Sequence, residues 1–486
     1  MEPKMKLKRL LKNISCIDVR GSKEIEITGL SCNSKTVVPG NLFIAKRGLS
    51  AQGAQFIDEA IDAGALAILT DMYNPFLSKA VVQLIAKDLQ GLEGKLAAEF
   101  YQDPSKDLFL VGVTGTSGKT TTTYLIRHLL ETLLGPTGLI GTVECIIGQQ
   151  YLPSTLTTPD VITNHKLLHE MKLCGSKAAV MEVSSHGLAQ GRVSYIDFDV
   201  AVFTNLSQDH LDYHKDMQEY AETKATLFSS ISASKVAVIN ADSPWSPVMI
   251  KNCPATILSY GIDKQADVRA TDLKLEEHSS EFMVEYKGEK YPFSAPLIGR
   301  FNVFNYLTAI SVGLARGLPL KKVLDVLSSF SAVPGRLQKV SNKKGLHIFV
   351  DYSHKPDALE NVLSTLSQIK KGKLICLFGC GGNRDTGKRP LMGEIAERLS
   401  DEVVITSDNP RSEDPLAIIQ QIMKGIKYPA NVLVEPDRRS AIEKAVARMK
   451  KDDILLIAGK GHETYQIFSH ATVEFDDRKV AEESCK

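Results

Sequence analysis

The feature that most constrains this chain is a glycine-rich loop between a buried strand and a helix. Residues 108–113 form an apolar run, residues 112–120 read GVTGTSGKT, and a helix is predicted to open near Thr120. Such a loop lets backbone N–H groups approach phosphates, and the helix N-terminus adds positive potential. Lys119 offers a charge for β- and γ-phosphates, and the Thr120 hydroxyl suits Mg²⁺. A glycine turn without a ligand would leave Lys119 unexplained, so the segment predicts a phosphate site.

The pattern around this loop predicts a doubly wound, mostly parallel sheet. Further apolar runs at 178–183, 200–204 and 236–240 are typical of buried parallel strands. Residues 281–298 instead alternate in polarity across a Lys-Gly pair, which predicts a hairpin beside that sheet. The central part of the chain is therefore an α/β unit.

Two further α/β units flank the central one. The first 105 residues mix short apolar runs with helical segments, and strand candidates alternate with helices after residue 334. A chain of 486 residues accommodates about three domains at roughly 100 to 200 residues each. We therefore predict three α/β domains, at 1–105, 106–333 and 334–486.

Composition excludes several classes of protein. The net charge of +1 gives no electrostatic basis for bulk nucleic-acid binding. The sequence has neither a secretory signal nor an uninterrupted apolar stretch of ~18 residues, so we expect a cytoplasmic protein that does not enter the membrane. Its eight cysteines include no C-x-x-C pair, which favours buried thiols over a zinc site or a disulfide framework.

Polar side chains gather where two of the predicted parallel strands end. The segment EVSSHGL begins at Glu182, and NLSQDHLDYH, at 205–214, contains His210. Ligand groups in open parallel sheets belong at the carboxyl ends of strands. Taken singly, each segment is explained equally well as a capped turn. Together with the phosphate loop they supply a carboxylate and an imidazole near a Mg²⁺ site.

The motifs resemble those of one family. The loop form T-G-T-x-G-K-T-T-T is similar to the Mur ligase and folylpolyglutamate synthetase superfamily, and the segments at 182–188 and 205–214 match Mur ligase motifs. Further matches occur in order along nearly the whole chain: LTTP at 156–159, the region 299–305, Gly335-Arg336, DYSHKPD at 351–357 and GKGHE at 459–463.

The resemblance implies an ATP- and Mg²⁺-dependent ligase that forms an amide through an acyl phosphate. It also implies a small N-terminal UDP-binding domain, a central P-loop domain and a Rossmann-like C-terminal domain. Lys224 aligns with a lysine that is carbamylated in the family, where its new carboxylate helps to hold a second Mg²⁺. The implied catalytic residues are Lys119, Glu182, His210 and Lys224, and the implied metal ligands are Thr120, Glu182, His210 and Lys224. The implied ATP-binding residues are Gly115, Thr116, Ser117, Gly118, Lys119, Thr120, Thr121, Asn305, Arg336 and Asp351.

The resemblance further implies two substrates, UDP-N-acetylmuramoyl-L-Ala-D-Glu and meso-diaminopimelate, in a cytoplasmic step of peptidoglycan precursor synthesis by a monomer. The residues expected to bind the UDP-muramoyl dipeptide are Cys32, Ser34, Leu49, Ser50, Ala51, Thr157, Thr158, Ser184, Gln190 and Arg192. Those expected to bind diaminopimelate are Arg384, Asp408, Asn409, Pro410, Arg411, Gly459 and Glu463. Diaminopimelate has a carboxylate that lysine lacks, and a guanidinium can grip it with two hydrogen bonds.

The sequence departs from the family pattern at five positions: Asn33, Lys35, Ser117, Ser353 and Lys355. Four other functions remain as alternatives. They are a lysine-adding sister ligase, a folate polyglutamylating enzyme, a nucleotide-dependent switch and a non-catalytic binder of the UDP-muramoyl dipeptide. Arg411 argues against the first, the N-terminal domain against the second, the absence of an N-K-x-D motif against the third, and the intact catalytic set against the fourth.

Overall fold

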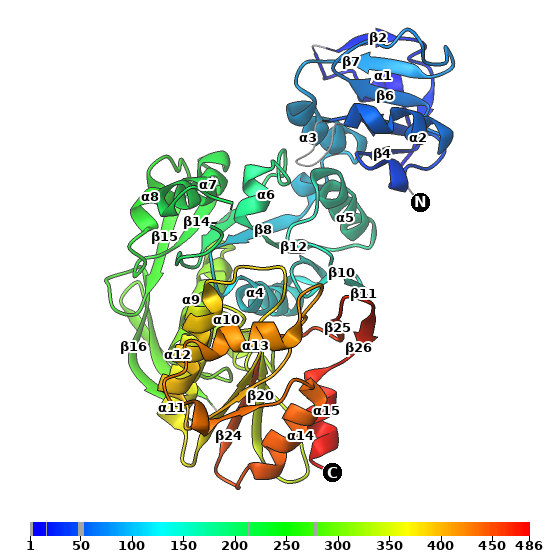
Figure 1. Ribbon diagram of the computed structural model, residues 1–486. Helices are drawn as coiled ribbons and strands as arrows, with labels where there is room; N and C mark the ends of the chain where they lie inside the picture. Colours follow the sequence, from blue (N-terminus) through cyan, green and yellow to red (C-terminus); the bar gives the residue numbers. More distant parts are fainter. Residues whose placement is uncertain (1–2, 16, 47–52, 212, 277–278) are drawn as a thin grey trace.

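The computed structural model describes residues 3–15, 17–46, 53–211, 213–276 and 279–486. Its α/β architecture comprises three larger sheets within residues 18–85, 109–295 and 338–458. Figure 1 shows the first sheet set apart from the rest, joined through α3 and α5, while the third lies below the central sheet. The expected domain boundaries, after residues 105 and 333, fall between these sheets and stay predictions.

The N-terminal sheet has five strands in the order β2-β7-β6-β5-β4, of which all but β2 are parallel. These strands are β2 (Asp18–Arg20), β4 (Gly29–Ser31), β5 (Asn41–Ile44), β6 (Ala67–Thr70) and β7 (Val82–Ile85). The other elements are β1 (Met5–Lys6), β3 (Glu26–Ile27), α1 (Leu7–Leu10), η1 (Ser34–Thr36), η2 (Gly53–Phe56), α2 (Ile57–Asp62), α3 (Leu89–Phe100) and η3 (Pro104–Asp107). Val161 and Ile162 of α5 join the core of this unit, which connects it to the central one.

The central sheet has eleven strands in the order β11-β10-β9-β12-β8-β13-β14-β15-β16-β17-β18, parallel from β9 to β16. The strands are β8 (Phe109–Thr114), β9 (Thr137–Ile140), β10 (Glu144–Ile147), β11 (Gln150–Pro153), β12 (Ala178–Glu182), β13 (Val200–Phe203), β14 (Val236–Asn240), β15 (Thr256–Gly261), β16 (Val268–Leu275), β17 (Ser280–Tyr286) and β18 (Glu289–Ala295). The predicted hairpin is β17–β18. The hairpin does not lie beside the sheet but extends it, because β17 pairs with β16 and so satisfies the hydrogen-bonding groups at the edge of the sheet.

Helices cover both faces of the central sheet because successive residues of its strands point to opposite sides. Val111 and Val113 of β8 face α4 (Lys119–Leu134), α9 (Arg300–Ala315) and α10 (Leu320–Leu327). Leu110 faces α5 (Val161–Leu173) and α7 (Met217–Ser230), near α6 (Ser185–Ala189) and α8 (Ser246–Ile250). The phosphate loop is therefore held between two buried cores.

The C-terminal sheet has six strands in the order β19-β20-β24-β21-β22-β23, of which only β19 is antiparallel. Its elements are β19 (Gln338–Lys339), β20 (His347–Asp351), α11 (Pro356–Ile369), β21 (Leu374–Phe378), α12 (Lys388–Leu399), β22 (Glu402–Ile405), α13 (Pro415–Met423), η4 (Pro429–Asn431), β23 (Val432–Val434), α14 (Arg438–Arg448), β24 (Ile454–Ala458), β25 (Tyr465–Ile467), β26 (Thr472–Glu474) and α15 (Asp477–Ser484). Ile298 and Phe301 of the central unit pack into its core, which forms an apolar contact between the two.

Candidate active site

The phosphate loop leaves β8 and opens α4, and two of its glycines are required by space and by backbone conformation. Gly115 and Gly118 have φ of 149° and 82°. A Cβ on Gly115 would lie 1.9 Å from Thr204 Oγ1, and one on Gly118 would lie 2.7 Å from Asn305 Oδ1. The loop therefore packs closely against the end of β13 and against α9. Any residue with a Cβ at position 115 or 118 would prevent this packing.

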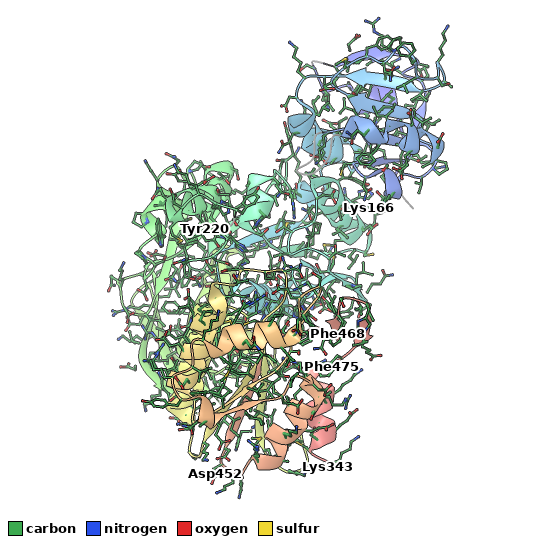
Figure 2. All side chains as sticks on the ribbon, in the orientation of Figure 1. Lys166, Tyr220, Lys343, Asp452, Phe468 and Phe475 are labelled. Carbon is green, nitrogen blue, oxygen red and sulfur yellow. The ribbon has the colours of Figure 1, made fainter. Side chains whose placement is uncertain are left out.

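The side-chain nitrogens of two lysines meet at this loop. Lys119 Nζ donates to the carbonyls of Gly115 (2.9 Å) and Thr116 (3.0 Å), while Lys224 Nζ donates to Gly115 O (3.1 Å). Lys224 lies on α7, only 1% exposed, beside Tyr220, which Figure 2 marks. Burial lowers the pKa of Lys119 to about 8, and burial together with the charge of Lys119 holds the pKa of Lys224 well below its usual value. The lowered pKa favours the neutral amine of Lys224, and a neutral amine is a nucleophile.

His210 lies in the loop after β13 with φ of 54°. Its Nε2 is 3.1 Å from Asp209 Oδ2, and burial lowers the pKa of His210 to about 4. Asp209 Oδ2 also pairs with Lys355, which belongs to the C-terminal unit. A neutral imidazole held by a carboxylate suits a place in or beside a metal site.

Glu182 ends β12 and is 1% exposed. Its Oε1 accepts from the Thr142 backbone N–H (2.9 Å) and its Oε2 from the Thr142 hydroxyl (3.0 Å). The Thr142 hydroxyl also lies 3.0 Å from Thr157 Oγ1. Sequence reasoning missed Thr142, although its place directly after the strand β9 was a usable signal.

The described residues contain no cluster of three or more His, Cys, Asp or Glu side chains that could hold a metal ion. The implied set supplies only Glu182 and His210 of these types, together with the Thr120 hydroxyl and Lys224. These donors fit Mg²⁺, a hard cation that keeps several waters, provided that Lys224 carries an added carboxylate.

The residues expected to bind the muramoyl dipeptide on the central unit form one hydrogen-bonded network. Thr158 Oγ1 donates to the Glu182 carbonyl (2.9 Å) and to Ser184 Oγ (3.1 Å). Arg192 Nη1 donates to the Thr158 carbonyl (2.8 Å), and its Nη2 donates to Gln190 Oε1 (2.6 Å). The network begins at the Glu182 backbone, so it borders the phosphate site.

The remaining residues expected to bind this substrate lie on the N-terminal unit. Ser34, in η1, donates its hydroxyl to Glu59 Oε2 (2.7 Å). Cys32 is half-buried, and burial raises the pKa of its thiol to about 12. Leu49, Ser50 and Ala51 lie outside the described residues. The structure therefore does not bring Cys32 and Ser34 into the network around Glu182.

The expected nucleotide residues come from three elements. Asn305 Oδ1 accepts from the Thr122 hydroxyl (3.2 Å). Arg336 crosses from the C-terminal unit, donates to Thr120 Oγ1 (3.0 Å) and lies over the Tyr352 ring at 4.6 Å. Asp351 accepts from the Leu337 backbone N–H (2.6 Å), so it fixes the turn that presents Arg336.

The residues expected to bind diaminopimelate gather, apart from Arg384, at the carboxyl ends of β22 and β24. Asn409 Nδ2 donates to Glu463 Oε2 (2.8 Å), and a Cβ on Gly459 would lie 2.6 Å from Asp408 Oδ2. Arg411, after Pro410, has φ of 55°, donates from Nη1 to the Gly382 carbonyl (2.8 Å), and its backbone bridges to Phe468, marked in Figure 2.

The structure differs from the expected set of diaminopimelate-binding residues at two lysine or arginine side chains. Arg384 is exposed in the loop after β21. Lys460, which sequence reasoning passed over, is fully buried and donates to Asn409 Oδ1 (3.1 Å) and Glu463 Oε2 (3.0 Å). Lys460 therefore fixes the side chains of Asn409 and Glu463, two of the residues expected to bind diaminopimelate.

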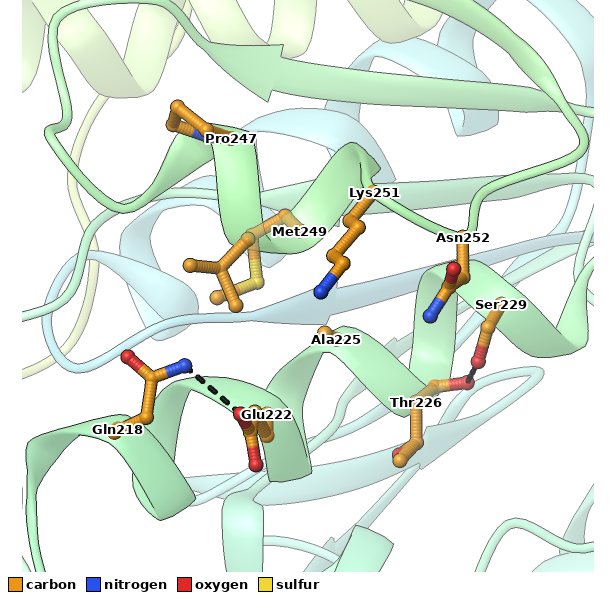
Figure 3. A pocket seen from close by; sticks show the side chains of 10 residues that line it. Gln218, Glu222, Ala225, Thr226, Ser229, Pro247, Met249, Lys251 and Asn252 are labelled. Carbon is orange, nitrogen blue, oxygen red and sulfur yellow. Dashed lines mark hydrogen bonds between the residues drawn. The ribbon is translucent and has the colours of Figure 1, made fainter.

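A hollow of about 500 Å³ lies elsewhere, between α7 and α8 (Figure 3). It is lined by Gln218, Glu222, Ala225, Thr226, Ser229, Pro247, Val248, Met249, Lys251 and Asn252. None of the candidate site residues that the structure describes lines it, although α7 also carries Lys224. We therefore do not place the active site there.

Comparison with known families accounts for all three units. Residues 113–313 match the Mur ligase middle domain, 335–461 the Mur ligase glutamate ligase domain, and 26–101 the Mur ligase family catalytic domain. The chain belongs to the Mur ligase family. The fold and the resemblance expected from its motifs are thereby confirmed.

Individual Mur ligases are similar over the full length. The UDP-N-acetylmuramoyl-L-alanyl-D-glutamate–2,6-diaminopimelate ligase of Caldanaerobacter subterraneus subsp. tengcongensis is 42% identical, with 99% of this chain and 98% of the relative covered. The ligase of the same name from Chlamydia pneumoniae is 43% identical over 98% of both chains. A solved structure of a ligase with that name superposes with a TM-score of 0.72 at 32% identity, covering 99% of each chain. Among the described residues, no helix is long and apolar enough to cross a membrane.

Proposed function

We propose that this Mur ligase joins meso-diaminopimelate to the D-Glu γ-carboxylate of UDP-N-acetylmuramoyl-L-Ala-D-Glu at the expense of ATP. The observation that carries the proposal is the group of side chains at the carboxyl ends of β22 and β24, where the segment that carries Asp408, Asn409 and Arg411 meets Glu463. A guanidinium suits the second carboxylate of the substrate, and the acidic groups suit its ammonium. The names of the relatives, which include 2,6-diaminopimelate, support the same substrate.

An amide forms from a carboxylate in water only after activation. In the proposed reaction the glutamate γ-carboxylate attacks the ATP γ-phosphate, ADP leaves, and the amine of diaminopimelate then displaces phosphate from the acyl phosphate. Catalysis of this kind depends on positioning and charge neutralisation rather than on a protein nucleophile. Lys119 and the loop N–H groups would hold the phosphates, and the network around Glu182 and Thr158 would orient the carboxylate.

Bound Mg²⁺ would neutralise phosphate charge, with Thr120, Glu182, His210 and a carbamylated Lys224 as its neighbours. The burial of Lys224 supports the modification, because a neutral amine adds CO₂ and the resulting carbamate would lie against the phosphate loop. We further propose that the enzyme acts as a cytoplasmic monomer with small-molecule substrates alone.

Arg411 provides a test of substrate choice. We expect Arg411→Met to lower kcat/KM for diaminopimelate by about tenfold, because the loss of one charged hydrogen bond costs about 1.5 kcal/mol and every 1.4 kcal/mol is tenfold. Turnover of L-lysine, which lacks the second carboxylate, should not fall. Parallel kinetics with both amino acids measure this, and an equal loss for both would contradict the assignment. Arg411→Lys keeps the charge and the backbone strain and serves as the matched variant.

Among the described residues, polar contacts between the C-terminal unit and the central unit include Arg336 with Thr120 and Lys355 with Asp209. We expect Lys355→Met to lower kcat/KM for ATP about tenfold, because a charged hydrogen bond of about 1.5 kcal/mol between the units is lost. Lys370→Met is the control, since Lys370 is exposed to the same degree (27% against 28%) and pairs with Asp401 inside the C-terminal unit. Equal kinetics for the two variants would contradict a role of this contact between the units.

A further inference from the structure

A buried arginine contacts both loops that carry Arg384 and Arg411 and belongs to none of the motifs above. Arg389, on α12, is 0% exposed. Its Nη1 donates to Glu413 Oε2 (2.9 Å) and to Gln421 Oε1 (2.8 Å). Its Nη2 donates to Glu413 Oε1 (3.0 Å) and to the Gly381 carbonyl (3.1 Å). Both terminal nitrogens are thus engaged twice, in the fork geometry that a guanidinium offers and an ammonium does not.

Arg389 has partners in two different loops, Gly381 and Glu413, and a further partner, Gln421, on α13. Gly381 precedes Arg384 in the loop after β21, and Glu413 follows Arg411 in the loop after β22. Glu413 Oε1 also accepts from the Asn383 backbone N–H, so the carboxylate links the second loop to the first. The ion pair of Arg389 with Glu413 therefore contacts both the loop that carries Arg384 and the loop that carries Arg411.

The two loops are also in direct backbone contact. The Gly382 N–H donates to the Asn409 carbonyl (2.9 Å), and the Gly382 carbonyl accepts from Arg411 Nη1 (2.8 Å). A Cβ on Gly382 would lie 1.9 Å from the Pro410 carbonyl oxygen. With this spacing, a small shift of either loop moves Arg411 relative to Arg384.

The Arg389 side chain is buried while that of Glu413 is 30% exposed, and such an ion pair gives little net stability, because removing the guanidinium from water costs about as much as the attraction returns. Such a pair is explained better when it fixes a geometry, and here Arg389 of α12 joins the loops carrying Arg384 and Arg411, with Gln421 of α13 as a further partner. We propose that Arg389 is a positioning residue that sets the distance between Arg384 and Arg411, and thereby the fit of an amino acid with two carboxylates. This inference rests on the proposed function. It adds a residue, Arg389, that influences the choice of amino acid without contacting the substrate.

The test compares Arg389→Lys and Arg389→Met with Arg398→Met in the full-length enzyme. Arg398 lies on the same helix and pairs with Glu360 at 2.7 Å on the exposed surface, which makes it a matched control. Wild type and variants are assayed with diaminopimelate and with L-lysine, and KM is measured separately for ATP, for the UDP-muramoyl dipeptide and for the amino acid. Thermal unfolding of each variant identifies any loss of fold.

We expect Arg389→Met to raise KM for diaminopimelate about tenfold, with Arg389→Lys between it and wild type, because misplacement of binding groups by about 1 Å has effects of this order or larger. KM for ATP and for the UDP-muramoyl dipeptide should stay unchanged, as should the turnover of L-lysine. Arg398→Met should resemble wild type throughout. If Arg389→Met does not fold, Arg389→Lys tests the inference, because its KM should rise for diaminopimelate and not for ATP or the UDP-muramoyl dipeptide.

Two results would overturn the inference. One is an unchanged KM for diaminopimelate in a folded Arg389→Lys or Arg389→Met enzyme. The other is an equal rise of all three KM values, which would reduce Arg389 to a general structural role. Both leave the proposed function intact, since wild-type turnover of diaminopimelate is measured in the same assay. Absence of that wild-type turnover would instead contradict the proposed function, and the inference with it.

Discussion

Replacing Lys119 by alanine is expected to lower the rate of ATP-dependent ligation by about 10³-fold or more. A cation placed against a transferring phosphoryl group contributes roughly 10³ to 10⁵ in rate, and Lys119 begins the helix that follows the phosphate loop. Its ammonium lies within 2.9–3.0 Å of two loop carbonyls, so it is held at the loop where we expect the triphosphate to bind. Phosphate release and mass detection of the ligated product give the two readouts.

The control for this variant is a lysine of the same unit that lies away from the loop. Lys172, on α5, pairs with Asp107 at 2.6 Å near the surface, and Lys172→Ala should keep the wild-type rate. Lys119→Arg retains the charge with another shape and should fall between wild type and alanine. Ligation at the wild-type rate by Lys119→Ala would reject the phosphate loop as the site of ATP.

Lys224→Ala is expected to show the second largest loss, about 100-fold in kcat, because ligands and their immediate supports around a metal typically contribute 10- to 100-fold. The alanine variant lacks the amine that adds CO₂. Supplying a small carboxylate such as formate or acetate should restore part of the rate if the carbamate is what the site needs. The rate of the wild-type enzyme should in turn rise with added bicarbonate when the enzyme has been prepared without CO₂.

Glu222 provides the matched control on the same helix. It accepts from Gln218 at 2.8 Å and lines the hollow in Figure 3, so Glu222→Gln should leave kcat unchanged and should not respond to formate. If Lys224→Ala loses activity without any response to small carboxylates, the lysine acts through its amine and the carbamate is rejected.

The parts of the site that the sequence predicts well are those carried by one continuous segment. A strand, a glycine loop and a helix with Lys119 at its start are neighbours in the chain, and the loop closes as expected because Gly115 and Gly118 take conformations that favour glycine. Asp408 to Arg411 and Gly459 to Glu463 are likewise short segments after buried strands. Parallel pairing brings such segments to one edge of the sheet without further information.

The parts that the sequence does not predict depend on pairs that are distant along the chain. Lys355 and Asp209 are 146 positions apart, and Glu182 meets Thr142 across 40. A charged residue gives no signal in the sequence of whether its partner is another residue or water, so no motif singled out Arg389. The hairpin was predicted, but its edge pairing with β16 was not, because alternation fixes the face of a strand and not its neighbour.

The central claim is that this chain adds diaminopimelate to a UDP-muramoyl dipeptide, and one experiment tests it most directly. The purified protein is incubated with ATP, Mg²⁺ and UDP-N-acetylmuramoyl-L-Ala-D-Glu, and meso-diaminopimelate and L-lysine are offered in parallel. Phosphate release and mass detection of the product are followed together. We expect stoichiometric ADP, phosphate and the diaminopimelate-containing tripeptide, with little product from lysine. Formation of the lysine product instead would contradict the role of Arg411, and no product with either amino acid would contradict the proposed reaction itself.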